Sequence, residues 1–276
     1  MGMFKDNVFS MSRFMNLCRK NMVESWKTNL LRVVLMYGVM TVIFVWSGYF
    51  AYKGLTPDAP DPMIKTSLYV FLWFGVICGC ISASLTMENM KTKTSRLSAL
   101  MTPATPFEKY FSRWLVSTIV YVVVFIIAFK LADYTRVAVY SIAYPENNVA
   151  VTQLKYLFAT NGDYAFLRYG GKEIRAFLLI YFLFQSCFIL GSSIWPKNSL
   201  IKTFVAGFVI MSLQGFVLGG VAQLLFGTMT ITSKMTPMDF QDSSANLGLI
   251  WASVMILLNW ALAYFRFKES EIINRL

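Results

Sequence analysis

The chain has 276 residues, of which 57% are hydrophobic and 14% are charged, and its mean hydropathy is +0.55. Soluble domains carry about 25% charged residues, so this composition indicates a protein embedded in a lipid bilayer. The formal net charge of +11 fits attraction to anionic lipid. It does not indicate nucleic-acid binding, which requires a basic face interleaved with aromatic residues on a soluble fold.

Residues 1–32 precede the first apolar stretch and predict an amphipathic helix on the membrane surface. Apolar residues recur along it at spacings of three and four, which places them on one helix face: Val8, Met11, Met15, Cys18, Met22 and Trp26. The other side carries Arg13, Asn16, Lys20, Glu24 and Lys27. A basic amphipathic helix of this kind lies in the plane of the lipid headgroups.

Six apolar stretches follow, each about as long as the 20 residues that a helix needs to cross a bilayer. They cover residues 33–52, 67–87, 114–132, 176–195, 204–226 and 247–265. The first begins too late for a signal peptide and lacks a small-residue cleavage site, so we expect it to stay in the chain. The prediction is an all-α integral membrane protein whose residues 33–276 form a six-helix transmembrane domain.

The orientation follows from the basic residues. With the amino terminus inside, the cytoplasmic segments hold 16 of the 25 lysines and arginines, which predicts that both termini are cytoplasmic. Segment 88–113 is then cytoplasmic and segment 133–173 extracytoplasmic. Turn signals in the latter predict a small ordered cap, which either meets a substrate or closes the outer end.

Lys130 is the one charged residue in the six predicted spans, and it lies near the end of the third. Its long stem can lie in hydrocarbon while the ammonium reaches the headgroups or pairs with Asp133. We expect this anchoring role rather than a place in an ion pathway, which usually needs a deeper charge.

Two kinds of residue inside the spans predict contacts between helices. The polar ones are the amides Gln185, Gln214, Gln223 and Asn259. Buried amides are most often interhelical hydrogen-bond partners, each worth roughly 0.6 to 2 kcal/mol, although a substrate path is the alternative. The small ones are Gly75, Gly79 and Ala83 in the second span and Gly215, Gly219 and Ala222 in the fifth. Such spacing lets backbones approach, either within the chain or between subunits.

Nothing in the sequence predicts catalysis by this chain. It has no histidine, which excludes Ser-His and Cys-His nucleophile pairs and removes the usual zinc and haem ligand. The nearest approach to a phosphate-binding loop begins at Gly170 and lacks its first glycine and its hydroxyl residue. The predicted spans hold no Asp or Glu, which disfavours an intramembrane enzyme. We therefore expect no cofactor and no metal in this chain.

The cytoplasmic segment between the second and third spans predicts two helices that meet at a corner. Residues 88–101 contain no Pro or Gly and predict a continuation of the second span, which Pro103 stops. Thr105, Pro106 and Glu108 then match a capping box with proline at the first helical position. The corner presents an apolar tip of Leu97, Leu100, Met101 and Phe107. The tip is either a rigid lever for a soluble partner or folded against the headgroups.

The stretch LSALMTPATPFEKYFSRWLV, together with six spans and an amphipathic entry helix, resembles the ABC-2 type transporter permeases of bacteria. In that family the corresponding stretch often contains Leu-Pro-Ala-Ser/Thr followed by Glu-Lys/Tyr and the next span. Thr102 departs from this pattern, since it stands where a leucine commonly precedes the proline.

The resemblance implies a permease subunit of an exporter in the bacterial cytoplasmic (inner) membrane. A separate ATP-binding subunit, which carries ATP and Mg, would dock on the corner, and a second permease half would complete the path as a homodimer or heterodimer. The implied coupling residues are Leu97, Leu100, Met101, Pro103, Thr105, Pro106, Phe107, Glu108 and Lys109. The alternative is a non-transporting assembly, sensor or interaction protein with a cytoplasmic partner.

Overall fold

A computed structural model describes residues 9–54, 60–159, 171–226 and 242–273 of the chain. Every regular element in these ranges is a helix. In chain order they are α1 (Met11–Glu24), α2 (Trp26–Tyr52), α3 (Met63–Ser84), η1 (Glu88–Met90), α4 (Lys93–Met101), α5 (Pro106–Leu115), η2 (Val116–Val120), α6 (Tyr121–Ala143), η3 (Leu154–Phe158), α7 (Gly171–Ile194), α8 (Ser199–Phe226) and α9 (Asp242–Ile273).

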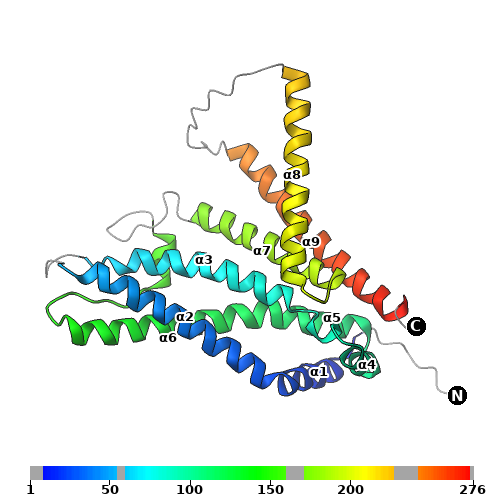
Figure 1. Ribbon diagram of the computed structural model, residues 1–276, viewed down its shortest axis with the longest axis horizontal. Coiled ribbons are helices and arrows are strands. Elements are labelled where there is room, and N and C mark those ends of the chain that lie inside the picture. Colours follow the sequence, from blue (N-terminus) through cyan, green and yellow to red (C-terminus); the bar gives the residue numbers. More distant parts are fainter. Residues whose placement is uncertain (1–8, 55–59, 160–170, 227–241, 274–276) are drawn as a thin grey trace.

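Five helical stretches are long and apolar enough to cross a bilayer, as far as the described residues extend. They are Trp26–Tyr52, Met63–Met90, Pro106–Ala143, Glu173–Ile194 and Leu249–Ser270. The chain is therefore a helical, multi-pass membrane protein. The remaining predicted span, 204–226, falls within α8, whose described apolar part is Ser199–Ile210. Figure 1 shows α8 rising steeply from the bundle that α2, α3 and α6 form.

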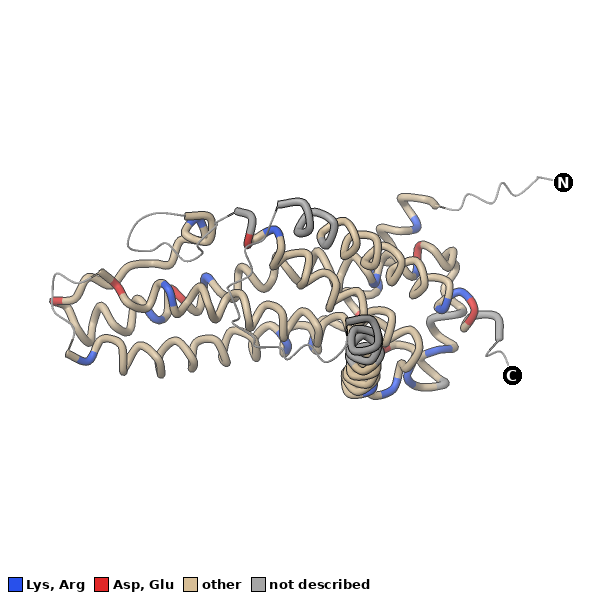
Figure 2. The backbone as a smooth tube through the Cα atoms, turned by 90° about the horizontal axis from the view of Figure 1, so that it is seen from above, with Lys and Arg blue, Asp and Glu red and all other residues tan. Residues whose placement is uncertain are grey.

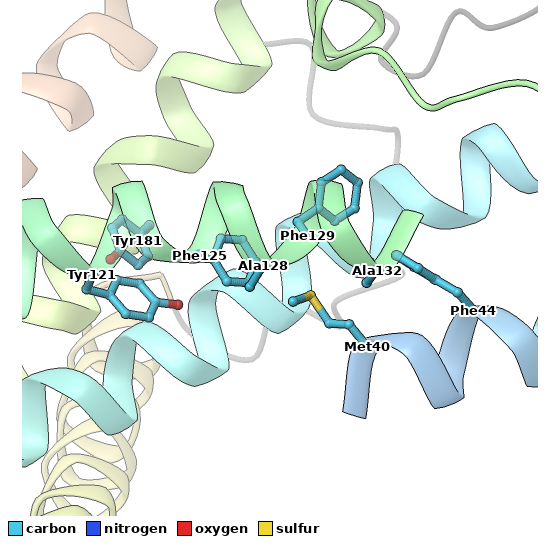
Figure 3. Close-up of a cluster of buried hydrophobic side chains, with 8 residues drawn as sticks. All are labelled: Met40, Phe44, Tyr121, Phe125, Ala128, Phe129, Ala132 and Tyr181. Carbon is cyan, nitrogen blue, oxygen red and sulfur yellow. The ribbon is translucent and has the colours of Figure 1, made fainter. Parts of the chain in front are cut away.

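The main core lies between α2 and α6, and Tyr181 of α7 joins it (Figure 3). Met40 and Phe44 of α2 face Phe125 and Phe129 of α6, and all four side chains are almost completely buried. The rings of Phe44 and Phe129 meet edge to face with centroids 5.8 Å apart. Because lipid tails are as apolar as these side chains, close packing rather than the hydrophobic effect stabilises the contact. Trp46, 71% exposed, lies on the outer surface of α2.

Two glycines of α3 pack against aromatic rings from two neighbouring helices. A Cβ atom at Gly75 would lie 3.1 Å from the Phe125 ring on α6, and one at Gly79 would lie 2.6 Å from the Tyr181 ring on α7. Both glycines therefore make contacts inside the chain. The surroundings of Gly215, Gly219 and Ala222 on α8 lie outside the described residues.

The expected continuation of the second span through residue 101 is wrong. The helix α3 ends at Ser84, and a turn, η1 and two further residues separate it from α4. The Ser84 and Thr86 hydroxyls donate to carbonyls of the last turn of α3, which satisfies groups that a longer helix would use. The Thr92 hydroxyl then accepts from the Ser95 amide at 3.3 Å and caps a new helix.

The helix that contains the predicted third span, 114–132, extends beyond it at both ends. One helical rod runs from Pro106 to Ala143, with a π-helical turn, η2, between α5 and α6. The predicted extracytoplasmic segment 133–173 thus begins inside α6. The rod continues past Asp133 because that carboxylate is buried and paired rather than exposed at a membrane surface.

Both described ends of the chain lie at the same end of the bundle (Figure 1). Here α1 begins and α9 ends, beside α4 and α5, and we call this the corner end. The opposite end, where α2 meets the link to α3 and α6 stops, is the far end. Figure 2 shows lysine and arginine residues gathered around the corner end, with others at the far end.

Candidate functional site at the corner between α4 and α5

The start of α5 carries the predicted capping box, which is confirmed. The Thr105 hydroxyl accepts from the Glu108 amide at 3.3 Å, and the Glu108 carboxylate accepts from the Thr105 amide at 3.1 Å. Pro106 occupies the first helical position, where its missing N–H costs nothing. Such a cap is worth about 1 kcal/mol and holds the angle at which the chain enters α5.

Glu108 also fastens α1 to α5, a role that the sequence did not reveal. Its side chain is fully buried, and Oε1 accepts from the Ser10 amide at 2.7 Å and from the Arg13 guanidinium at 3.0 Å. Phe14 of α1 adds a ring contact to Phe111 of α5, with centroids 5.5 Å apart. The single carboxylate therefore closes the cap of α5 with one oxygen and holds α1 with the other.

The amphipathic helix α1 packs on α5 through a face that the periodicity did not select. Phe14 and Leu17 are buried, whereas Met11 and Met15 of the predicted apolar face are more than half exposed. On the predicted polar side, Lys20 donates to the Thr102 hydroxyl at 3.0 Å. Trp26 belongs to α2 instead, because Ser25 interrupts the helix, and Val8 lies outside the described residues. Burial raises the pKa of the Cys18 thiol above its ordinary value.

The apolar tip of the corner is exposed. Met101 is 82% exposed and Leu97 is 57% exposed. Phe107 is 37% exposed and stacks on Phe111, with ring centroids 5.7 Å apart. Of the other predicted coupling residues, Pro103 is exposed, Lys109 is buried, and the side chain of Leu100 lies outside the described residues.

The inner side of α5 is joined to α9. The Tyr110 hydroxyl donates to the Trp260 carbonyl at 2.9 Å, and Trp114 meets the Trp260 ring with centroids 5.1 Å apart. Tyr264 of α9 makes edge contacts with the rings of Phe107 and Tyr110. The corner is therefore attached to α1 by a buried carboxylate, to α9 by aromatic rings, and to α6 by the continuous helix.

The predicted amides lie between helices where their side chains are described. The Gln185 amide on α7 donates to the Thr118 hydroxyl in the π-helical turn at 2.7 Å, and its buried Oε1 has no hydrogen-bond partner among the residues that the structure describes. The Asn259 amide on α9 donates to the Ser186 hydroxyl of α7 at 3.0 Å. The side chains of Gln214 and Gln223 lie outside the described residues.

A buried ion cluster occupies the far end, and the sequence reasoning missed it. The Arg136 guanidinium donates to Asp133 at 2.9 Å, to Asp61 at 3.2 Å and to the Tyr52 hydroxyl at 2.6 Å. The alternative in which Lys130 pairs with Asp133 is wrong: the Lys130 ammonium donates to the Thr152 carbonyl, and Asp133 binds Arg136. The spacing of three between Asp133 and Arg136 was the available signal.

No protein-family profile, curated protein sequence or solved structure gives a significant match to this chain. Its function must therefore be inferred from the chemistry and arrangement of its own residues.

Proposed function

We propose that this chain is the membrane-spanning permease subunit of an ABC-2-like transporter. A separate ATP-binding subunit docks on the corner and moves it. The observation that carries this proposal is the exposed apolar tip on a corner fixed to three other helices. Six spans with both termini in the cytoplasm, in a bacterial inner membrane, would place this tip in reach of a soluble partner.

The tip has the chemistry of a docking point. Met101 and Leu97 expose most of their apolar surface, and Arg96 lies on the same short helix. A few large apolar side chains at the centre of a contact usually supply most of the binding free energy, with charged residues at the rim. Methionine adapts to the shape of a partner because it has three rotatable bonds.

The attachments of the corner make it suitable for transmitting displacement. A partner that pushes on the tip acts on α5, and α5 is held to α1 through Glu108 and to α9 through Tyr110. The capping box and Pro106 stiffen the entry to α5, so displacement of the tip passes to α1 and α9 rather than being absorbed at that entry. ATP and Mg would bind the partner, and a second permease half would complete the path, with export as the direction that the family resemblance implies.

The test is copurification followed by nucleotide turnover. The full chain is purified in mild detergent from its native membrane, stoichiometric partners are identified by mass spectrometry, and ATP hydrolysis is measured after reconstitution. We expect an ATP-binding subunit as partner. Met101→Asp should reduce both the copurification of the ATP-binding subunit and the rate of ATP hydrolysis at least tenfold. The matched control is Ile142→Asp, because Ile142 is 83% exposed at the far end. This variant should leave the copurification and the ATP turnover unchanged.

Two outcomes would contradict the proposal. If repeated purifications yield no ATP-binding partner, the chain is not a subunit of this kind of transporter. If an ATP-binding partner copurifies equally well with the Met101→Asp chain, the corner is not its docking site. A stoichiometric partner that does not bind nucleotide would instead support the non-transporting assembly or sensor role.

A further inference from the structure

A cavity of about 310 Å³ opens at the corner end, beside the exposed tip. It is lined by η1 and α4 and by the ends of α7 and α9, and Figure 1 shows α4 and the end of α9 at this end of the bundle. Arg96, the residue before Leu97 of the tip, contributes to the wall, whereas Leu97 and Met101 do not. The cavity is therefore a surface distinct from the tip and next to it.

The innermost lining of this cavity is apolar and belongs to the core of the corner end. Met87, Met90 and Phe267 line it, and each is at most 4% exposed. All three are members of one buried cluster, which also contains Tyr110 of α5 and Ile189 of α7. Methionine side chains adapt to the shape of what they contact. An apolar side chain seated here would therefore press on a cluster that α5, α7 and α9 share.

The wall of the cavity carries one guanidinium whose charge is not balanced by a carboxylate. Arg96 donates to the Met90 carbonyl at 3.2 Å, and no carboxylate in the described part of the chain pairs with it. Arg266, by contrast, already pairs with Glu269 at 3.2 Å. A guanidinium has five N–H donors and binds a carboxylate more strongly than a neutral acceptor. The lining therefore fits an apolar group that has a single carboxylate beside it.

The cavity lies where three membrane-spanning stretches end. Met90, Ile194 and Ser270 all line it, and each is the last residue of one such stretch. Lys197 and Lys268, which directly follow the lining residues at positions 196 and 267, are exposed. The mouth is therefore at the aqueous boundary of the bundle rather than among acyl chains, and its surroundings favour an acidic segment over a basic one. A soluble protein that binds the tip can reach it.

We propose that this cavity receives a segment of the ATP-binding subunit in which an aspartate or glutamate stands beside a large apolar side chain. The apolar side chain packs on Met87, Met90 and Phe267, and the carboxylate binds Arg96. This inference rests on the proposed function, because it assigns a second contact to the subunit that docks on the tip. The tip adjoins α5, whereas the cavity adjoins the ends of α7 and α9, so the two contacts act on different helices.

Photocrosslinking from inside the cavity tests this proposal. In the full chain in its native membrane, p-benzoylphenylalanine replaces Ile194, a lining residue that is 39% exposed. We expect a crosslink to the copurifying ATP-binding subunit, and sequencing of the crosslinked peptide should find an acidic residue beside a large apolar one. The same replacement at Ile142, which is exposed at the far end, is the matched control and should give no crosslink to that subunit.

The outcomes separate this inference from the proposed function. If the ATP-binding subunit crosslinks from Leu97 in the tip but not from Ile194, the transporter assignment stands and the cavity assignment fails. If no ATP-binding subunit copurifies, the proposed function fails, and this inference fails with it. Crosslinks from Ile194 that lead only to lipid, to a second copy or to the chain itself would also overturn the cavity assignment.

A charge exchange tests the ion pair by itself. Arg96→Glu should lower the yield of the crosslink from Ile194 about fivefold, the upper value for a partly exposed ion pair. Lysine in place of the acidic residue of the crosslinked segment should then restore most of the yield. A loss caused by displacement of α4, whose Arg96 also bonds Met90, would not be restored in this way. Lys65→Glu makes the same charge change at an exposed position of the far end and should have no effect. Wild-type yield in Arg96→Glu, or no recovery in the exchanged pair, would overturn the proposal.

Discussion

Arg136 of α6 and Asp61, just before α3, form an ion pair in which neither side chain has any exposed surface. The Asp61 carboxylate also accepts from the Ala150 and Met63 amides, at 3.0 and 2.9 Å. The pair therefore joins the end of α6 to the start of α3 and to the extended segment that follows α6. Burying charge is costly unless every group is bonded, and here the partners are supplied by three parts of the chain.

Replacing Arg136 by Met should destabilise the fold strongly. The change leaves two buried carboxylates, Asp61 and Asp133, without their cation, and breaking such a pair costs about 3 to 5 kcal/mol. The thermal unfolding midpoint in detergent measures the effect. Adding Asp61→Asn and Asp133→Asn to the Met variant should recover part of the loss, since the uncompensated charges are then gone. A midpoint that stays at the wild-type value in Arg136→Met would contradict this assignment.

Glu108→Gln should loosen α1 while leaving the cap of α5 in place. Glutamine can close a capping box, but its neutral amide binds Arg13 less well than a carboxylate. Hydrogen bonds to charged groups contribute about 1.5 to 3 kcal/mol, so the amides of α1 should exchange hydrogen for deuterium markedly faster. Glu24→Gln serves as the control, because its ion pair with Lys20 is exposed and worth little. Unchanged exchange in α1 would show that aromatic packing alone holds it.

Gly79→Ala should destabilise the chain, whereas Gly38→Ala should not. The added Cβ at position 79 would lie 2.6 Å from the Tyr181 ring, and at position 38 it would meet nothing within 4 Å. Overpacking costs about 1 to 3 kcal/mol, while alanine is favoured over glycine in a helix by about 0.5 to 1 kcal/mol. Unfolding midpoints of the two variants provide the comparison. Tyr181→Leu in the Gly79→Ala chain should restore part of the loss by removing the ring.

Thr118→Val should cost more stability than Gln185→Met. The first change removes the Thr118 hydroxyl to which the buried Gln185 amide donates, and an unsatisfied buried group costs about 1 to 3 kcal/mol. The second removes that amide together with its Oε1 atom, which already has no hydrogen-bond partner in the described part of the chain. Unfolding midpoints decide the order. The reverse order would mean that the Gln185 amide makes contacts beyond Thr118, as a residue facing a water-filled or substrate path would.

The local features of this chain are the ones that sequence reasoning predicted well. Runs of apolar residues place the membrane helices because a bilayer requires a fixed length of them, and the start of α5 is recognisable because a capping box involves residues only three apart. One predicted boundary differs from the observed helix end, because the helix continues through Asp133, which is buried and paired with Arg136. Asp133 marked the end of a span only on the assumption that a charge must leave the membrane.

The missing information was in pairs of residues far apart in sequence. Glu108 binds Ser10 and Arg13, about a hundred positions earlier, and Arg136 binds Asp61 across 75 positions. Helical periodicity relates only residues that are near in sequence, so it cannot reveal such pairs. Each partner alone resembles an ordinary helix cap or an ordinary surface charge. The buried face of α1 was wrongly predicted for the same reason. Phe14 and Leu17 pack against α5, whereas the methionines of α1 are exposed.

The rod from Pro106 to Ala143 has 38 residues, a length of about 57 Å at 1.5 Å per residue. Its irregular turn, η2, lies about a third of the way along the rod from the corner. A π turn holds an extra residue and can migrate along a helix by shifting hydrogen bonds, which rotates one part of the rod about its axis relative to the other. A rotation of α5 about the rod axis would thus be taken up at η2, where Thr118 accepts from the Gln185 amide, before it reached Arg136. The far end can stay anchored while the near third of the same helix turns.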